Sequence, residues 1–155
     1  EERDRGLYEE EVYLKQFQEL DPQDAEDIEK VIKGSGQTIR KRPYADTWVK
    51  YLKSKGYHVY ILSNYSSYML DHTKKELTFR REMDGEVFSC YANQLKPDAE
   101  IYQTILNKYQ LKPEECVFID DRPENCRGAQ EQGIHTICFK DFKQVTADLE
   151  KLGVK

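Results

Sequence analysis

Three short polar groups in this sequence could act together on a phosphorylated molecule. Ser63-Asn64 follows an apolar run, Lys96 stands before a proline, and Asp120-Asp121 ends a second apolar run. A hydroxyl and a backbone N–H can bind phosphate oxygens, and a lysine can neutralise a phosphoryl group and a neighbouring carboxylate. An aspartate can hold Mg²⁺, which prefers a few oxygen ligands and retained waters. In such a centre the metal would stabilise charge on the group being transferred.

Taken singly, these groups have ordinary structural explanations. Ser63-Asn64 could be a helix N-cap and a turn, and Lys96 could be a surface lysine. Asp120-Asp121 is harder to explain, because adjacent carboxylates that end a buried strand are costly, although one could cap the next helix while the other faces water. The combination of the three groups, in this order, is what favours a functional site.

The elements that would position these groups alternate between strands and helices. This alternation predicts an α/β fold with a doubly wound, mostly parallel sheet. Right-handed crossovers would then bring the carboxyl ends of all strands, and the three polar groups with them, to one edge of the sheet. The predicted strands are Tyr57–Leu62, Cys116–Ile119 and His135–Phe139, with a short apolar segment at Val87–Tyr91; the predicted helices run from Pro43 to Gly56, from Ser66 to about Leu77, from Asp98 to Tyr109, from Pro123 to Gln132 and from Phe142 to Leu152.

Residues 1–42 differ from the rest of the chain. The stretch from Leu7 to about Gln37 is polar and helical, and Asp21-Pro22 reads as the start of a second helix, with the aspartate as N-cap and the proline at the first helical position. This pair of helices has too few apolar residues for a core of its own. We therefore expect residues 1–42 to be a small helical appendage and residues 43–155 to be the core domain.

Composition and charge argue against nucleic-acid and membrane partners and favour a cytoplasmic protein. The chain has 155 residues and a formal net charge of −5, with both signs mixed along it, whereas nucleic-acid binding would show as a basic stripe. No apolar run is long enough for a membrane span and no signal peptide is visible. The four cysteines (Cys90, Cys116, Cys126 and Cys138) form no C-x-x-C pair. A reduced, cytoplasmic protein is the simplest account.

Three motifs carry a resemblance to a known family. The residues Val59-Tyr60-Ile61-Leu62-Ser63-Asn64, Leu95-Lys96-Pro97-Asp98-Ala99-Glu100-Ile101-Tyr102 and Val117-Phe118-Ile119-Asp120-Asp121-Arg122-Pro123-Glu124-Asn125 resemble motifs II, III and IV of the haloacid dehalogenase (HAD) superfamily. The nearest branch is the phosphatases that include glucose 1-phosphate phosphatases and the N-terminal domain of soluble epoxide hydrolase. The resemblance covers about Pro43 to Phe139. It implies a HAD-like, Rossmann-like core, and the helical stretch before Pro43 resembles the remnant of that branch's helical cap.

The resemblance also implies roles for the residues that would touch phosphate. Ser63 would hydrogen-bond the phosphoryl group with the help of the Asn64 backbone. Lys96 would bridge the phosphate and the nucleophile. The implied substrate is a phosphorylated small molecule.

For the metal, the resemblance implies a Mg²⁺ ion held at the acidic pair. Asp121 would be the ligand, Asp120 would support Lys96 or the metal waters, and Asn125 would lie just behind the ligands. The sequence leaves open which of the two aspartates binds the metal directly.

The first motif of the family is missing from this sequence. In the family it is a buried central strand that ends in Asp-x-Asp, and its first aspartate is the nucleophile. We do not expect Asp4 to be that nucleophile, because no apolar strand precedes it. Without that strand, the strands bearing Ser63 and Asp120-Asp121 lose a ladder partner, and their backbone groups must be satisfied in another way.

We expect one of three structural consequences. The chain is a fragment of a longer protein, or another segment or chain fills the central slot, or the two flanking strands pair directly. An unpaired central slot would favour homo-oligomers or strand swapping.

Two functions remain open at this stage. The first is a Mg²⁺-dependent HAD phosphatase that works through an aspartyl-phosphate, of which this chain is an incomplete and inactive copy without a nucleophile. The second is a non-catalytic HAD-like binding or regulatory module. A receiver-type signalling domain fits poorly, because its acidic pair closes the first strand and its lysine follows the last.

Overall fold

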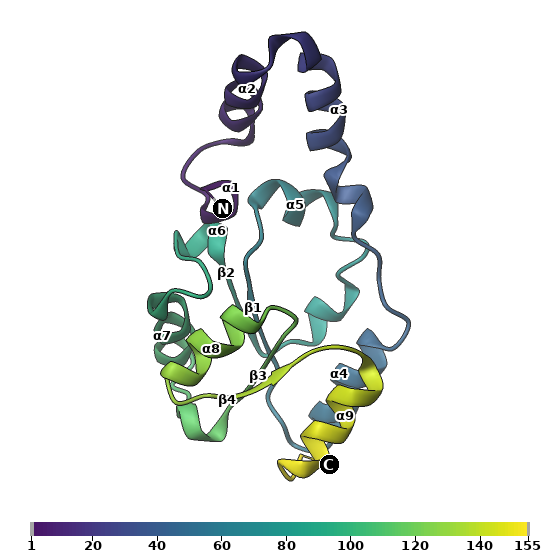
Figure 1. Ribbon diagram of the computed structural model, residues 1–155. Coiled ribbons are helices and arrows are strands. Elements are labelled where there is room, and N and C mark those ends of the chain that lie inside the picture. The colour runs from purple at the N-terminus through teal and green to yellow at the C-terminus, as the bar shows by residue number, and fades with distance from the viewer. Residues whose placement is uncertain (1, 155) are drawn as a thin grey trace.

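Helices and strands alternate along the chain from residue 43 onward, as the sequence predicts. The computed structural model describes residues 2–154 (Figure 1). The strands are β1 Tyr60–Ser63, β2 Gly85–Phe88, β3 Val117–Asp120 and β4 His135–Cys138. The α-helices are α1 Glu2–Arg5, α2 Glu10–Leu20, α3 Ala25–Gly34, α4 Ala45–Ser54, α5 Ser67–His72, α6 Ser89–Ala92, α7 Ala99–Lys108, α8 Pro123–Glu131 and α9 Phe142–Lys151, with 3₁₀ turns at Pro22–Asp24, Ser35–Thr38, Thr78–Glu82 and Pro113–Glu115.

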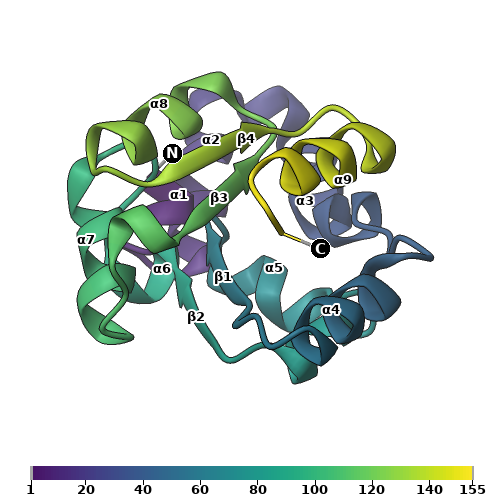
Figure 2. The ribbon, with the colours of Figure 1, turned by 90° about the horizontal axis from the view of Figure 1, so that it is seen from below.

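The strands of residues 2–154 form two separate parallel pairs. β1 pairs with β2, with Ser63 opposite Phe88, and β3 pairs with β4, with Asp120 opposite Cys138. Figure 2 shows the order β2, β1, β3, β4, so that β1 and β3 are the inner strands. These inner strands are not paired with each other, and no strand of the described residues lies between them. We call this break in the ladder the β1–β3 gap, and it excludes direct pairing of the two flanking strands.

Helices cover both faces of the strand layer (Figure 2). α7 and α8 lie on one face, where Ile101, Tyr102 and Ile105 of α7 and Ala129 of α8 join Val87 and Ile134 in a buried core cluster. α4 and α9 lie on the other face, where Val145 and Leu149 pack against Ile137 of β4. The fold class predicted from the sequence, α/β with parallel strands, is confirmed.

The α4–α9 face carries a groove. A groove of about 570 Å³ lies between the two helices, and Trp48 and Phe142 are among its lining residues. Val117 and Ile119 of β3 reach this cluster but stay half-buried. The core on this side of the β1–β3 gap is therefore open.

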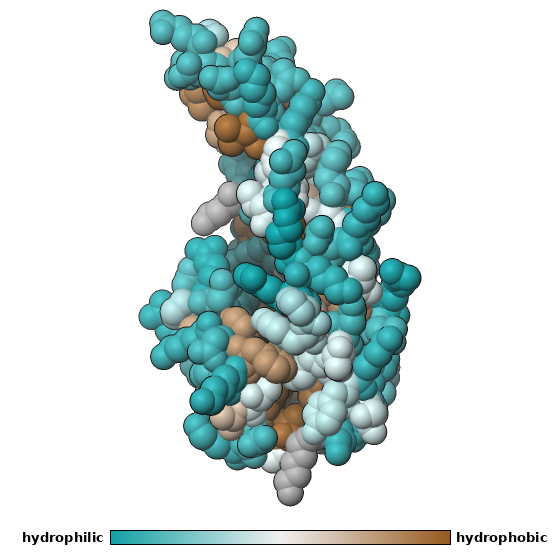
Figure 3. Space-filling model, turned by 90° about the vertical axis from the view of Figure 1, so that its right-hand side faces the viewer, coloured by the Kyte–Doolittle hydropathy of each residue, from teal (hydrophilic) through white to brown (hydrophobic). Residues whose placement is uncertain are grey.

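Within the first forty residues, the helices α2 and α3 stand apart from the strands. α2 and α3 form a hairpin at the far end of the molecule, while α1 lies beside α6 (Figure 1). Figure 3 shows apolar surface on one side of this hairpin, above a narrow waist. The exposed large apolar residues of this segment are Leu7, Tyr8, Val12, Phe17, Leu20 and Val31. The boundary at residue 42 stays a prediction.

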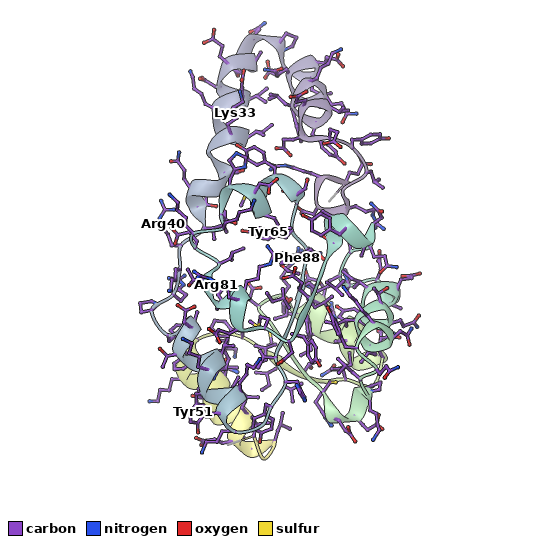
Figure 4. All side chains as sticks on the ribbon, turned by 180° about the vertical axis from the view of Figure 1, so that it is seen from behind. Lys33, Arg40, Tyr51, Tyr65, Arg81 and Phe88 are labelled. Carbon is purple, nitrogen blue, oxygen red and sulfur yellow. The ribbon has the colours of Figure 1, made fainter. Side chains whose placement is uncertain are left out.

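A small cluster connects the hairpin side to the strand ends. Tyr65 and Phe88, labelled in Figure 4, lie beneath α5, with ring centroids 6.2 Å apart. Phe88 is buried together with Leu70 of α5. The helix α5 therefore packs against the carboxyl ends of β1 and β2 on the side that faces the α2–α3 hairpin (Figure 1).

Some local expectations were wrong. The helix expected to continue to Leu77 ends at His72, and the Thr73 hydroxyl donates to the Met69 carbonyl at 2.6 Å in its last turn. The apolar segment at Val87–Tyr91 divides into the end of β2 and the short helix α6. β1 is half-buried rather than buried on both faces, since its edge toward the β1–β3 gap has no strand partner within the described chain.

No helix in the described part of the chain is long and apolar enough to cross a membrane.

Gly128 of α8 gives a test of how α8 packs against the loop that carries Lys96. A Cβ at this position would lie 2.5 Å from the Pro97 carbonyl oxygen and 3.0 Å from the Tyr102 ring. Gly128→Ala should therefore lower the free energy of unfolding by roughly 1–3 kcal/mol in urea titrations. The matched control is Gly34→Ala, where nothing lies within 4 Å of the new Cβ. The control should change stability by at most about 1 kcal/mol, in the stabilising direction, and equal losses in the two variants would contradict this packing.

Candidate active site

The side chain of Lys96 joins the carboxyl ends of the two inner strands. Its Nζ donates to the Leu62 carbonyl oxygen of β1 at 3.0 Å and to Asp120 Oδ2 of β3 at 2.6 Å. Both charged side chains are only 7% exposed. A buried charge is tolerated when it is paired and hydrogen-bonded, so Lys96 and Asp120 form a fixed ionic link across the end of the β1–β3 gap.

Asn64 holds Lys96 in this position. Its Oδ1 accepts from the Lys96 backbone N–H and its Nδ2 donates to the Lys96 carbonyl, both at 2.9 Å. The side chain of Asn64 thus mimics one rung of a ladder between the end of β1 and the Lys96 loop. The backbone N–H of Asn64, which the sequence assigns to phosphate, is not used by this pair of bonds.

Asp120 has all of its oxygen contacts inside the protein. Oδ1 accepts from the Arg122 backbone N–H and from Asn125 Nδ2, both at 2.9 Å, while Oδ2 accepts from Lys96. These bonds fix the carboxylate at the start of α8. Asp120 therefore serves as the anchor of Lys96 and not as a free carboxylate.

Asp121 and Ser63 differ from Asp120 in being free. Asp121 is exposed, Ser63 is half-buried, and neither side chain makes a hydrogen bond or ion pair with another residue of the described chain. Ser63 is the last residue of β1, and Asp121 directly follows the last residue of β3. Both therefore lie at the carboxyl ends of the inner strands, where Lys96 also lies. These two oxygen-bearing groups are the ones available to a ligand.

Asn125 carries the clearest sign that a further polar group belongs here. The residue is 2% exposed, its Nδ2 is bound to Asp120, and its Oδ1 has no partner among residues 2–154. Buried amide oxygens are normally hydrogen-bonded. A carboxylate (Asp121) and an unpartnered amide oxygen (Asn125) fit the hard oxygen ligands and retained waters of Mg²⁺.

The residues present supply one side of such a metal site. No cluster of three His, Cys, Asp or Glu residues that could hold a metal occurs in the described residues. The acidic pair therefore does not make a complete ligand set with the other residues of the 2–154 range.

Two supporting residues were missed by the reasoning from sequence. Tyr102 of α7 donates its hydroxyl to the Asn125 carbonyl at 2.7 Å, and burial raises the pKa of this phenol. The Lys96 ammonium lies 5.3 Å from the centre of the Phe118 ring. Phe118 could have been found, because it precedes Asp120 by two positions and so shares its face of the strand. Tyr102 is the last residue of the second of the three motifs, but nothing local predicts that its hydroxyl reaches the Asn125 carbonyl.

A double-mutant cycle tests the Lys96–Asp120 link. Lys96→Met should lower the free energy of unfolding by roughly 3–5 kcal/mol, because it leaves the Asp120 carboxylate buried without its cation. In the double variant with Asp120→Asn the losses should not add, and the coupling should exceed about 0.5 kcal/mol in urea titrations.

Lys112→Met is the matched control, since Lys112 forms an exposed pair with Glu115. It should leave stability unchanged within error. Additive losses at Lys96 and Asp120 would contradict the ionic link.

Comparison with known proteins places this arrangement in a family. A model of the haloacid dehalogenase-like hydrolases matches residues 4–133. Flavin mononucleotide hydrolase 1 of Arabidopsis thaliana is 39% identical over 66 residues, which are 43% of this chain and 27% of that protein. Bifunctional epoxide hydrolase 2 of Rattus norvegicus is 30% identical over 107 residues, which are 65% of this chain and 19% of that protein. The chain thus spans less than a third of either relative.

Solved structures agree on the fold. A HAD family enzyme from Bacteroides thetaiotaomicron, in complex with magnesium and inorganic phosphate, superposes with a TM-score of 0.76 at 21% identity, covering 93% of this chain and 77% of that one. A predicted HAD-like hydrolase from Porphyromonas gingivalis gives a TM-score of 0.76 at 22% identity, covering 99% of this chain and 78% of that one. The resemblance drawn from the three motifs is confirmed: this chain belongs to the haloacid dehalogenase-like hydrolases.

Proposed function

We propose that this chain supplies the phosphate- and metal-binding half of a Mg²⁺-dependent phosphomonoesterase. The observation that carries the proposal is the Lys96 ammonium, held between the Leu62 carbonyl oxygen and Asp120 at the ends of the two inner strands. The unpaired side chains of Ser63 and Asp121 lie at the carboxyl ends of the same two strands. One cation, one hydroxyl and one unpaired carboxylate suit a phosphate group accompanied by a divalent cation.

Each residue would have a distinct task. The Ser63 hydroxyl and the Asn64 backbone N–H would donate to phosphate oxygens, and Lys96 would neutralise part of the phosphate charge. Asp121 would hold Mg²⁺, and Asn125 Oδ1 would accept from a water of the metal. The metal would supply stabilisation of the charge that develops on the transferring phosphoryl group.

The nucleophile would come from a strand in the β1–β3 gap. Its carboxylate oxygen would form a bond to phosphorus while the ester oxygen leaves and is protonated, and water would then hydrolyse the aspartyl-phosphate. Both flanking strands are parallel to their partners and present unpaired edges, which supports a third parallel strand between them. Its terminal carboxylate would replace the Leu62 carbonyl as the second acceptor of Lys96.

The substrate class we propose is a phosphorylated small molecule. The relatives include a haloacid dehalogenase of Burkholderia cepacia as well as the flavin mononucleotide hydrolase. A free carboxylate at Asp121 favours phosphate with its metal over a 2-haloacid, because an anionic substrate without a cation would be repelled there.

A non-catalytic binding module is the second candidate. It is favoured by the β1–β3 gap itself, since no strand and no further carboxylate of residues 2–154 completes the ligand set. A module of this kind would bind Mg²⁺ and phosphate without turnover even when the gap is filled.

Restoring the strand separates the two candidates. An extension at the N-terminus that carries an apolar strand ending in Asp-x-Asp should give phosphate release from p-nitrophenyl phosphate with Mg²⁺, whereas the 155-residue chain alone should give none. Asp121→Asn in the extended version should lower kcat/KM by about 10²-fold or more. The matched control Asp148→Asn changes a half-buried carboxylate of α9 that pairs with Lys151, and it should leave kcat/KM unchanged. No turnover in the extended version, or no effect of Asp121→Asn, would refute the phosphatase.

Removal of the metal is a separate test on the same extended version. Excess EDTA should abolish phosphate release, and added Mg²⁺ should restore it. The reason is that Asp121 and the phosphate oxygens are both negatively charged and repel each other unless a cation lies between them. Undiminished turnover in EDTA, measured after dialysis against metal-free buffer, would contradict a metal role for Asp121.

A further inference from the structure

Two cysteine thiols lie directly behind the acidic pair. Cys126 Sγ donates to the Asp120 carbonyl oxygen at 3.5 Å, and Cys138 Sγ donates to the Asp121 carbonyl oxygen at 3.9 Å. The two thiols therefore donate to the carbonyl oxygens of two consecutive residues. Cysteines that only fill a core would face apolar neighbours, whereas both of these face the polar backbone of the acidic turn.

The same geometry brings the two thiols to each other. Cys138 ends β4 opposite Asp120, and the next residue, Phe139, donates its N–H at 2.8 Å to the Asp120 carbonyl that Cys126 also binds. Burial raises the pKa of the Cys126 thiol to about 11, and the neighbouring Cys138 thiol adds to this rise. Gln130 of α8 also donates to the hydroxyl of Thr136 at 2.8 Å, and Thr136 shares a face of β4 with Cys138. Cys126 and Cys138 therefore lie on elements that face each other, as a disulfide requires.

The remaining cysteines are placed elsewhere. Cys116 precedes β3 at its opposite end, where its thiol donates to the Lys112 carbonyl at 3.2 Å. Cys90 is buried in α6, against the backbone near Gly6. All four cysteines are free in this structure, so Cys126 and Cys138 are the pair that the described residues bring together.

We propose that Cys126 and Cys138 are an oxidation site at which a low-molecular-weight disulfide is converted into an intramolecular disulfide. Cys138 is half-buried and Cys126 is buried, so the reagent reaches Cys138 first. The deprotonated Cys138 sulfur attacks one sulfur of the reagent, forms a mixed disulfide and releases one thiolate. The Cys126 sulfur, after losing its proton, attacks Cys138 and displaces the second thiolate. Two protein thiols are oxidised, and the reagent is reduced to two thiols.

This disulfide would tie α8 to the end of β4 across the acidic turn. α8 carries Asn125, whose amide holds Asp120. An S–S bond brings its two sulfurs to about 2 Å from each other. It would also remove the thiol donors from the carbonyls of Asp120 and Asp121. The oxidation state of the pair would therefore act on the part of the site that holds the metal.

Peptide mapping of the native chain tests the proposal. The reduced chain is treated with oxidised glutathione, blocked with N-ethylmaleimide, unfolded and cleaved after glutamate. The expected product is Asn125–Glu131 linked to Gln132–Glu150, lighter by two hydrogens than the separate peptides, while Cys116–Glu124 carries N-ethylmaleimide. Recovery of the first two peptides unlinked, each blocked or bearing glutathione, would overturn the proposal, as would a link that forms only after unfolding.

Two variants sharpen the result. Cys126→Ser should keep glutathione on Cys138 as a stable mixed disulfide, because the second thiol is missing. Cys116→Ser is the matched control and should form the same link as the unmodified chain. A link from Cys138 to Cys116 would count against the pair. The map of the unmodified chain decides the question even if Cys126→Ser does not fold.

Discussion

The buried ion pair between Lys96 and Asp120 is the constraint on which the site depends. A lysine and an aspartate that are both 7% exposed must satisfy each other and their remaining hydrogen bonds locally. Asn64 fixes the lysine backbone, while the Arg122 N–H and Asn125 fix the carboxylate. The ends of β1 and β3 are thereby held at a set separation although the two strands share no backbone hydrogen bond.

The β1–β3 gap explains why this site has one finished side and one open side. Parallel sheets are normally larger than two strands and are covered on both faces, yet here each sheet has two strands and β1 remains half-buried. The finished side holds Lys96, Asp120 and Asn125 in a closed network. The open side presents Ser63 and Asp121, which is the pattern expected when the remaining groups of a catalytic centre come from a neighbouring strand.

The sequence predicted the parallel α/β fold, because β-prone runs alternate with amphipathic helices. Two of these helices are followed by Gly56 and Gly133, whose positive φ angles match their predicted role as helix terminators. It also predicted that Lys96 would meet the acidic pair. It could not distinguish Asp120 from Asp121, because the distinction comes from tertiary hydrogen bonds to Asn125 and Lys96. The amide clamp of Asn64 was equally invisible, since an asparagine after a strand looks like any turn residue.

A crystal structure of the strand-extended version with Mg²⁺ and a phosphate analogue tests the central claim most directly. The account predicts a parallel strand hydrogen-bonded to both β1 and β3, with its terminal carboxylate beside Lys96 and the metal bound to Asp121. A strand packed elsewhere, β1 paired directly with β3, or a metal held away from Asp121 would contradict it.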